Sequence, residues 1–288
     1  MTSTCFFVSD LHGRVDRYRK LFSAIERVNP DVVFLGGDLL PPFIDSLRQE
    51  ESTGADFVEG FLATEFDRLH AKLKERYPSV FLILGNDDPR SEEDSIEQAG
   101  SAGLWRNIQS RIVTFGSYAF GGYAFVPPTP FRLKDWERYD VSRFIDPGCV
   151  PPEEGSFSVP VDRSSISRQT IQNDLEQLTQ GMDFSRAVFL FHSPPYDTVL
   201  DRAALEGRMV DHAPMDPHVG SVAIRRFLER SQPLVSMHGH VHESVEGTGS
   251  WRERIGKTHI FGGAHSGPEL ALVRFTLENP ADASRELL

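Results

Sequence analysis

The sequence predicts an α/β protein in which two mixed sheets face each other and helices cover the outside. Two observations support this. Short apolar runs, typical of buried strands, alternate with segments of helical periodicity as far as Met237. Further along each half of the chain, strand-like runs follow one another directly, without an intervening helix. Alternation favours parallel strands with right-handed crossovers, and the adjacent runs favour a second sheet.

Five apolar runs rich in Val, Phe, Leu and Ile are the predicted buried strands, and they cover residues 5–8, 32–35, 80–84, 187–191 and 234–237. The spacing of apolar residues predicts a helix over 14–28, which Asn29 and Pro30 should end. The same periodicity recurs over 57–73 and, more weakly, over 222–228. Each of these helices precedes the next strand, as βαβ units require.

Residues 112–115 and 118–126 form adjacent strand-like runs separated by Gly116 and Ser117, which predicts a hairpin. Two later runs, 258–261 and 269–276, are separated by a segment with three glycines. We expect the tail to contribute to a second sheet rather than to extend the parallel one.

The segment 127–161 is rich in proline and glycine but also carries Phe131, Trp136, Tyr139 and Phe144. This mixture predicts an ordered insertion rather than a linker. We therefore expect a single domain over residues 1–288, with 127–161 as a cap-like insertion.

Composition narrows the classes of function. The chain has 288 residues and a net charge of −12, which makes binding of long nucleic acid unfavourable. No apolar run approaches the roughly 20 residues of a membrane span. The start lacks the features of a secretory signal, and two cysteines, Cys5 and Cys149, cannot build a framework of disulfides. We expect a cytoplasmic protein without a membrane partner.

Each of the five predicted strands is followed within a few residues by side chains that can bind a metal ion. The carboxyl ends of parallel strands open onto one crevice, so these side chains should converge. They are Asp10, His12, Asp38, Asn86, His192, His240 and His242. Taken singly, an Asp-x-His, a Gly-Asp turn or a histidine after a strand is more often a structural feature than a ligand. The ordered set of five strand ends is what predicts a metal site.

The pairs Asp10/His12 and His240/His242 are each spaced by two residues, which places both side chains on one side if the backbone is extended. Glycine precedes Asp38, Asn86 and His240, where the chain must turn or pass close to a ligand. Imidazole, carboxylate and amide oxygen without thiolate suit Mn, Fe or Zn, and we favour Mn. Seven ligands fit two ions if one carboxylate bridges them, and Asp38 is the natural bridge.

Five motifs resemble the ordered motifs of calcineurin-like metallophosphoesterases: SDLHG at 9–13, GGDL at 36–39, GNDD at 85–88, FHSPP at 191–195 and GHVHES at 239–244. The resemblance implies a four-layer α/β/β/α sandwich, two metal ions, and hydrolysis of phosphate esters. The mechanism we favour is direct attack on phosphorus by a hydroxide that bridges the ions. Carried over motif by motif, the resemblance assigns two ligand sets that share Asp38. The first is Asp10, His12, Asp38 and His242, and the second is Asp38, Asn86, His192 and His240.

The sequence departs from the family pattern at Asp87, where many members have a histidine that protonates the leaving group. An ionised Asp87 would repel a dianionic monoester more than a monoanionic diester, and a protonated Asp87 could donate to the leaving oxygen. We assign catalytic roles to Asp87, Asn86 and Asp38. A structural alternative is that Asp87 and Asp88 cap a helix beginning near Pro89.

The predicted function is that of a phosphodiesterase acting on a small or nucleotide-type diester. The alternatives are a phosphomonoesterase or nucleotide pyrophosphatase, and a binding scaffold of the same fold. Arg132, Lys134 and Arg138 in the insertion are predicted to contact the substrate phosphate, although solvated charges would look the same. The loop histidines His212, His218 and His265 are weaker candidates, and His238 should pack in the core.

Overall fold

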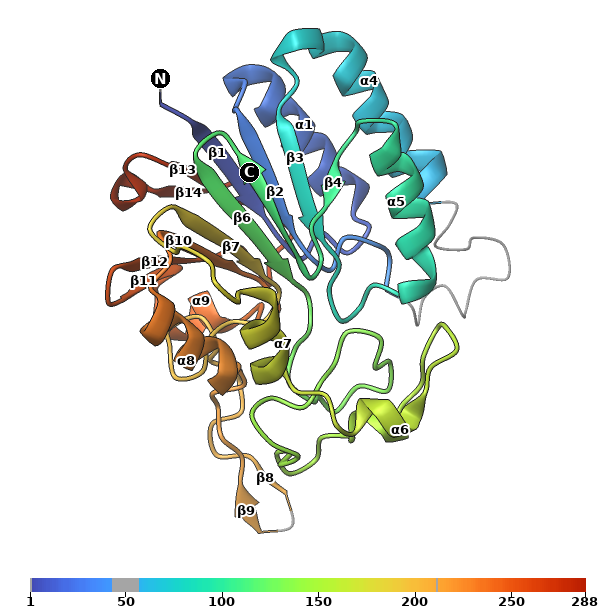
Figure 1. Cartoon of the computed structure of the whole chain (residues 1–288), viewed down its shortest axis with the longest axis vertical. Coiled ribbons are helices and arrows are strands. Elements are labelled where there is room, and N and C mark those ends of the chain that lie inside the picture. Colours follow the sequence, from blue (N-terminus) through green and yellow to red (C-terminus); the bar gives the residue numbers. More distant parts are fainter. Residues whose placement is uncertain (1, 43–56, 211) are drawn as a thin grey trace.

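Two six-stranded sheets face each other in the computed structural model, which describes residues 2–42, 57–210 and 212–288. Helices cover the outer face of each sheet, so the layers run α/β/β/α (Figure 1). The predicted fold class is therefore confirmed. Both sheets are mixed, because the first has antiparallel strands at one edge and the second has them at both edges.

The first sheet has the order β14-β13-β1-β2-β3-β4. Strands β1 to β4 are parallel, whereas β13 pairs antiparallel with both β1 and β14. Their bounds are β1 (Thr4–Val8), β2 (Val32–Gly36), β3 (Ser79–Ile83), β4 (Arg106–Asn107), β13 (Ala271–Thr276) and β14 (Ser284–Leu287).

The second sheet has the order β11-β12-β10-β7-β6-β5, with β12, β10, β7 and β6 parallel. Its strands are β5 (Arg111–Phe115), β6 (Tyr118–Tyr123), β7 (Ala187–Phe191), β10 (Val235–His238), β11 (Arg252–Ile255) and β12 (Thr258–Gly262). The hairpin predicted around Gly116 is the antiparallel pair β5/β6. A separate small hairpin joins β8 (Met209–Val210) and β9 (Ala213–Pro214).

The assignment of strands to sheets differs from the prediction in two respects. Of the five buried runs, three lie in the first sheet and two, β7 and β10, lie in the second. The tail is also divided, because β12 joins the second sheet while β13 returns to the first beside β1. The open edge of β1 offers unpaired backbone groups, and pairing with β13 satisfies them.

Three longer helical elements cover the first sheet: α1 (Val15–Val28), η1 with α4 (Val58–Ala63 and Thr64–Leu73), and α5 (Glu93–Ser101). Two cover the second sheet: α7 (Ile171–Leu178) and α8 (Val222–Ser231). Helix α1 buries Tyr18, Leu21 and Ile25 and ends at Asn29, whose left-handed backbone donates to the Ile25 carbonyl, as the sequence predicts. The short elements are η2 (Lys74–Arg76), η3 (Arg90–Glu92), η4 (Pro152–Glu154), α6 (Arg163–Ile166), α9 (Ser244–Thr248) and η5 (Pro280–Asp282).

Phenylalanine rings fill the space between the two sheets. Phe34 and Phe81 of the first sheet contact Phe120 of the second, with ring centroids 5.1 Å apart in both pairs. All three side chains are buried. This aromatic cluster holds the two sheets together, and with them the strand ends at one edge of the sandwich.

Residues 127–161 lie beyond the carboxyl ends of the parallel strands and carry only one turn of helix, η4 (Figure 1). The Trp136 indole donates to the Asp88 carbonyl (3.0 Å), and the Asp135 carboxylate accepts the Arg90 N–H (2.8 Å). Asp140 accepts the Val222 N–H at the start of α8 (2.7 Å). The segment is thus hydrogen-bonded to loops of both halves of the sandwich.

Within the described ranges, no helix combines the length and the apolar character that crossing a membrane would require.

We expect Phe34→Ala to lower the free energy of unfolding by about 3–5 kcal/mol, because it removes a ring from the interface between the sheets and leaves a cavity. Urea denaturation followed by circular dichroism measures the change. Phe144, which is 73% exposed, provides the control, and Phe144→Ala should stay within about 0.5 kcal/mol of the wild type. Equal effects of the two substitutions would contradict the role given to Phe34.

Candidate metal centre

Seven potential ligands follow strands of both sheets at one edge of the sandwich. Asp10 and His12 follow β1, Asp38 follows β2, and Asn86 follows β3. From the second sheet, His192 is the residue directly after β7, while His240 and His242 follow β10. The centre therefore straddles the interface between the sheets.

The first group of donors is compact. Single donor atoms of Asp10, His12, Asp38 and His242 all lie within 4.8 Å of one another. His12 Nε2 lies 3.1 Å from His242 Nε2, and His242 Nε2 lies 3.1 Å from Asp10 Oδ1. The structure brings together the four residues that the motifs assign to one ion.

The second group surrounds His192. Its Nε2 atom lies 3.0 Å from Asn86 Oδ1 and 3.3 Å from Asp38 Oδ2, and its ring centroid is 5.2 Å from that of His240. The same Asp38 Oδ2 atom lies 3.9 Å from His12 Nε2 in the first group. Asp38 Oδ2 therefore lies near an imidazole nitrogen of each group.

The backbone at four of the seven ligands is left-handed, not extended. The φ angle is 57° at Asp10, 47° at His12, 51° at Asp38 and 73° at His240. The extended backbone on which strand alternation within the Asp-x-His and His-x-His pairs depends is therefore not formed, because the chain turns sharply as it leaves the strand. Such backbone costs about 1–3 kcal/mol per non-glycine residue and persists only where neighbours hold it, typically at functional sites.

Hydrogen bonds between the ligand loops hold these turns. Asp10 N–H donates to the Gly37 carbonyl (3.0 Å), and His12 N–H donates to the Asp38 carbonyl (2.8 Å). The Asp10 carboxylate accepts the His240 N–H (3.0 Å), which links the two sheets. His192 Nδ1 lies 2.8 Å from the Gly36 carbonyl, which fixes the tautomer that leaves Nε2 free for a metal.

Two glycines are required by close approach. A Cβ atom at Gly37 would lie 2.6 Å from His192 Nδ1, and one at Gly85 would overlap Asp38 Oδ1 and lie 2.8 Å from His192 Cε1. Gly37 also has a φ of 93°. A side chain would displace His192 at the first position and Asp38 together with His192 at the second, which explains the Gly-Asp and Gly-Asn pairs in the sequence.

Asp88 has a role that the sequence did not reveal. Its buried carboxylate accepts the N–H groups of Leu39 (3.0 Å), Leu40 (2.8 Å) and Gly85 (2.9 Å). It therefore ties together the loops that carry Asp38 and Asn86. Neither Asp87 nor Asp88 caps the following helical turn, which begins after Pro89 without a side-chain cap. The capping alternative is therefore wrong.

Asp87 stands at the mouth of the centre. Its N–H donates to Asp38 Oδ1 (2.8 Å), and its Oδ2 lies 3.6 Å from His12 Nδ1. The side chain is 40% exposed. Burial and the neighbouring Asp38 carboxylate raise the pKa of Asp87 to about 6.

Carboxylates and imidazoles of the centre shift one another's protonation. Burial alone would raise the pKa of Asp38, but His192 and His12 lower it to about 2. Burial alone would lower the pKa of His192, but Asp38 and Asp10 raise it to about 10. Burial and the neighbouring His192 lower the pKa of His240 to about 4. The carboxylates therefore favour a positive charge at this place.

The three basic residues predicted to contact substrate lie in different surroundings. Lys134 is buried and its ammonium group is paired with Glu137 (2.5 Å) and the Thr129 carbonyl (2.8 Å), so the prediction for Lys134 is wrong. A buried ammonium group that left these partners would be unpaired in a desolvated place, so Lys134 is not free to bind a substrate anion. Arg132 is exposed.

Arg138 stacks on Phe125 with its guanidinium carbon 3.9 Å from the ring centroid, and it is paired with Asp174. It lines a cavity of about 460 Å³ together with Arg90 and Trp136. None of the seven predicted metal ligands lines this cavity. The substrate role of Arg138 stays a prediction.

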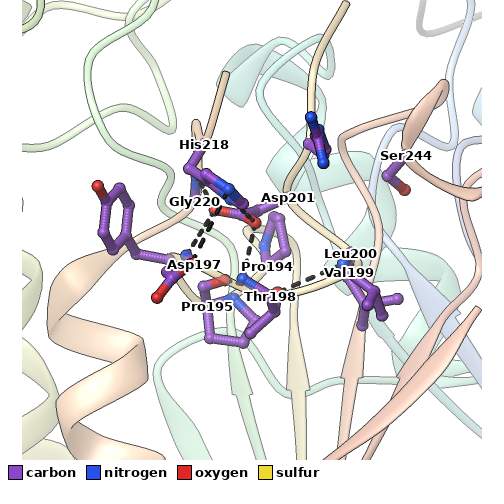
Figure 2. A network of polar contacts seen from close by, with 12 residues as sticks. Pro194, Pro195, Asp197, Thr198, Val199, Leu200, Asp201, His218, Gly220 and Ser244 are labelled. Carbon is purple, nitrogen blue, oxygen red and sulfur yellow. Dashed lines mark hydrogen bonds and ion pairs between the residues drawn. The ribbon is translucent and has the colours of Figure 1, made fainter. Parts of the chain in front are cut away.

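The loop histidines take distinct places. Figure 2 shows His218 beside the buried Asp201, with His218 Nδ1 2.8 Å from Asp201 Oδ1. Asp201 also accepts the N–H groups of Asp197 and Thr198 (both 2.9 Å), so this pair orders the loop after β7 (Figure 2). His265 contacts Glu269 (3.1 Å), and His212 is exposed.

His238 is buried and contacts the Ser236 hydroxyl (2.8 Å) and the Ser193 carbonyl (2.9 Å). It therefore packs in the core, as its spacing predicts.

Comparisons with known proteins agree with the motifs. The model of the calcineurin-like phosphoesterase family matches residues 4–244. This match includes all seven predicted ligands and the whole insertion. No curated protein sequence matches the chain significantly.

Solved structures share the fold. One crystal structure aligns with a TM-score of 0.59 at 18% identity over 100% of this chain and 99% of its own. The protein TT1561 of Thermus thermophilus aligns with a TM-score of 0.58 at 14% identity, over 100% of this chain and 99% of its own. An archaeal phosphodiesterase aligns less closely, with a TM-score of 0.47 at 10% identity over 99% of each chain. On the family match, which covers most of its length, this chain belongs to the calcineurin-like phosphoesterases and is a metal-dependent phosphoric ester hydrolase.

Proposed function

We propose that the protein is a phosphodiesterase that hydrolyses a small or nucleotide-type phosphodiester with two transition metal ions, Mn being favoured. One ion would be held by Asp10, His12, Asp38 and His242. The other would be held by Asp38, Asn86, His192 and His240. The observation that carries the proposal is the convergence of the first four donor atoms within 4.8 Å, with Asn86 and His192 adjoining them through Asp38.

The donor set fits metal ions on its own chemistry. Two imidazole nitrogens, Nε2 of His12 and of His242, face each other at 3.1 Å beside a carboxylate oxygen of Asp10. Such an arrangement needs a proton or a cation between the nitrogens. The pKa of His192 is raised because the carboxylates of Asp38 and Asp10 favour its charged form, so this second group also favours a cation. Bound ions would supply Lewis-acid polarisation of the phosphoryl group and activation of the attacking water.

The chain's own residues would orient the ester and manage its protons. Asp38 and Asn86 sit where both groups of donors meet, so they would fix the substrate phosphate relative to the attacking oxygen. Asp87 lies at the exposed edge of this place with a pKa of about 6, so a fraction of it is protonated near neutral pH. In that form it can donate to the leaving oxygen.

Asp87 also supports the preference for diesters. When ionised, it adds negative charge beside Asp38 at the mouth of the centre. A monoester dianion would meet more repulsion there than a diester monoanion. The net charge of −12 disfavours binding of long nucleic acids. The proposed substrate is therefore a small-molecule ester in the cytoplasm. Residues 127–161 would cap the site within a single domain.

We expect Asp38→Ala and Asn86→Ala to abolish phosphodiester turnover while leaving the fold intact. Each substitution removes an oxygen ligand that lies beside His192 Nε2 in the second proposed metal site. Rates on bis-p-nitrophenyl phosphate and circular dichroism spectra measure the two effects. Asn173→Ala, at an exposed position of α7, serves as the matched control and should keep wild-type activity. Retained activity in both variants would refute the assignment.

Asp87→Asn should lower kcat on the diester by about 10²–10⁴, the usual contribution of a general acid. Asp87→His should shift the ratio of diester to monoester rates towards the monoester, because it removes the negative charge. Initial rates on bis-p-nitrophenyl and p-nitrophenyl phosphate measure this ratio. A wild type that favours the monoester would speak for a phosphomonoesterase or pyrophosphatase, and an unchanged ratio in both variants would contradict the role given to Asp87.

The metal-free protein should lose stability as pH rises. The folded pKa of His192, about 10, exceeds its unfolded value of 6.5, so its contribution is complete below pH 6.5 and is lost as pH rises through 10. Asp88, whose pKa burial and Asp38 raise to about 8, acts in the same direction. Thermal midpoints in chelator between pH 6.5 and 10 measure the decline.

Two comparisons complete that experiment. Saturating Mn²⁺ should remove most of the decline, because the ion replaces the proton on His192. His192→Gln should flatten the metal-free curve. Parallel curves with and without Mn²⁺, together with less than one transition metal per purified chain, would favour the scaffold alternative.

A further inference from the structure

We propose that Arg17 is a positioning residue for the metal ligand Asp10, and that its guanidinium sets the metal affinity of the centre by fixing the backbone of the Asp10 loop. This inference rests on the proposed metal centre. Nothing in the motifs points to Arg17, which lies in the first turns of α1 and outside SDLHG.

The contacts of Arg17 are made to main-chain carbonyls. Nη1 donates to the Asp10 carbonyl (2.5 Å), and Nη2 donates to the Gly267 carbonyl (2.5 Å) and more weakly to the His265 carbonyl (3.4 Å). The planar guanidinium can reach both loops at once because its donors are fixed in a fork. Arg17 thereby joins the loop after β1 in the first sheet to the loop after β12 in the second.

Arg17 is a buried cation without a carboxylate partner. Its side chain is 4% exposed, and none of the ion pairs among the described residues includes it. A buried charge is costly unless it is paired or hydrogen-bonded. The neighbouring Arg14, by contrast, is half-exposed and pairs with Asp16. The hydrogen bonds to these main-chain carbonyls are what compensate the burial of the Arg17 charge.

The Asp10 loop is the place where such a contact matters. Asp10 has a left-handed backbone, with φ of 57°, and its carboxylate contacts both His240 N–H and His242 Nε2. A hydrogen bond to the Asp10 carbonyl restrains the peptide that follows Asp10, and with it the direction of the carboxylate. Partners that orient a ligand typically change metal affinity by about 10–100-fold when removed.

Charge and positioning predict opposite signs for the loss of Arg17. The guanidinium donates to the Asp10 carbonyl, so its positive charge lies close to the metal ligands. As a charge alone, Arg17 would repel the metal ions, so its removal would tighten binding. As a positioning residue, it keeps Asp10 in place, so its removal weakens binding. The sign of the change in affinity therefore separates the two roles.

The experiment compares Mn²⁺ dissociation constants of the full chain, measured by competition with a chelating dye, for the wild type, Arg17→Met and Arg17→Lys. We expect Arg17→Met to raise the dissociation constant by about 10–100-fold. Arg17→Lys keeps the charge but cannot span both carbonyls, so we expect weaker binding there too. Arg19→Met, at an exposed position of the same helix, should bind as the wild type does.

Thermal midpoints in chelator separate positioning from folding. If Arg17→Met does not fold, Arg17→Lys decides the question. Wild-type affinity in Arg17→Lys, tighter binding in Arg17→Met, or a lower metal-free midpoint with unchanged affinity in both variants would each overturn the inference. If the wild type itself binds no Mn²⁺, the proposed function fails and this inference fails with it. Equal Mn²⁺ affinity in the wild type and all three variants would instead overturn the inference on Arg17 alone.

Discussion

A single buried carboxylate, that of Asp88, holds together the two loops on which the centre depends. It accepts three backbone N–H groups, two from the loop that begins with Asp38 and one from the residue before Asn86. The Asp88 carbonyl, in turn, accepts the Trp136 indole. Without a partner of this kind, three buried N–H groups would each cost about 1–3 kcal/mol. Asp88 therefore contacts the loop of Asp38, the loop of Asn86 and the insertion.

The metal ligands also connect the two sheets. Asp10 of the first sheet accepts the N–H of His240 in the second, and His192 of the second contacts the Gly36 carbonyl of the first. These contacts cross the same interface that the phenylalanine cluster fills further inside the sandwich. The aromatic cluster sets the spacing of the sheets, and the polar contacts at the edge set the spacing of the ligands.

Sequence reasoning located the buried strands and the ligands that follow them, because apolar runs and the ends of parallel strands are properties of local sequence. It failed where tertiary contacts decide. The return of β13 to β1 depends on pairing between distant segments. The left-handed turns at Asp10 and His12 depend on hydrogen bonds to the loop after β2. Lys134 is predicted to contact phosphate, but the fold buries it together with Glu137, and only that burial excludes an anion. A signal for Arg17 is present in the sequence: it lies four residues before Leu21, at the N-terminal end of the buried face of α1.

The pairing of β1 with β13 has a consequence for biosynthesis. Thr4 to Phe7 lie opposite Val273 to Thr276, so β1 leaves the ribosome long before the strand that completes its hydrogen bonds. Until β13 is made, one side of β1 is an uncovered edge, and contacts of such long range form slowly. Newly made chains are therefore open to aggregation while the segments between these two strands are translated, and chaperones that shield strand edges should be most needed during that interval.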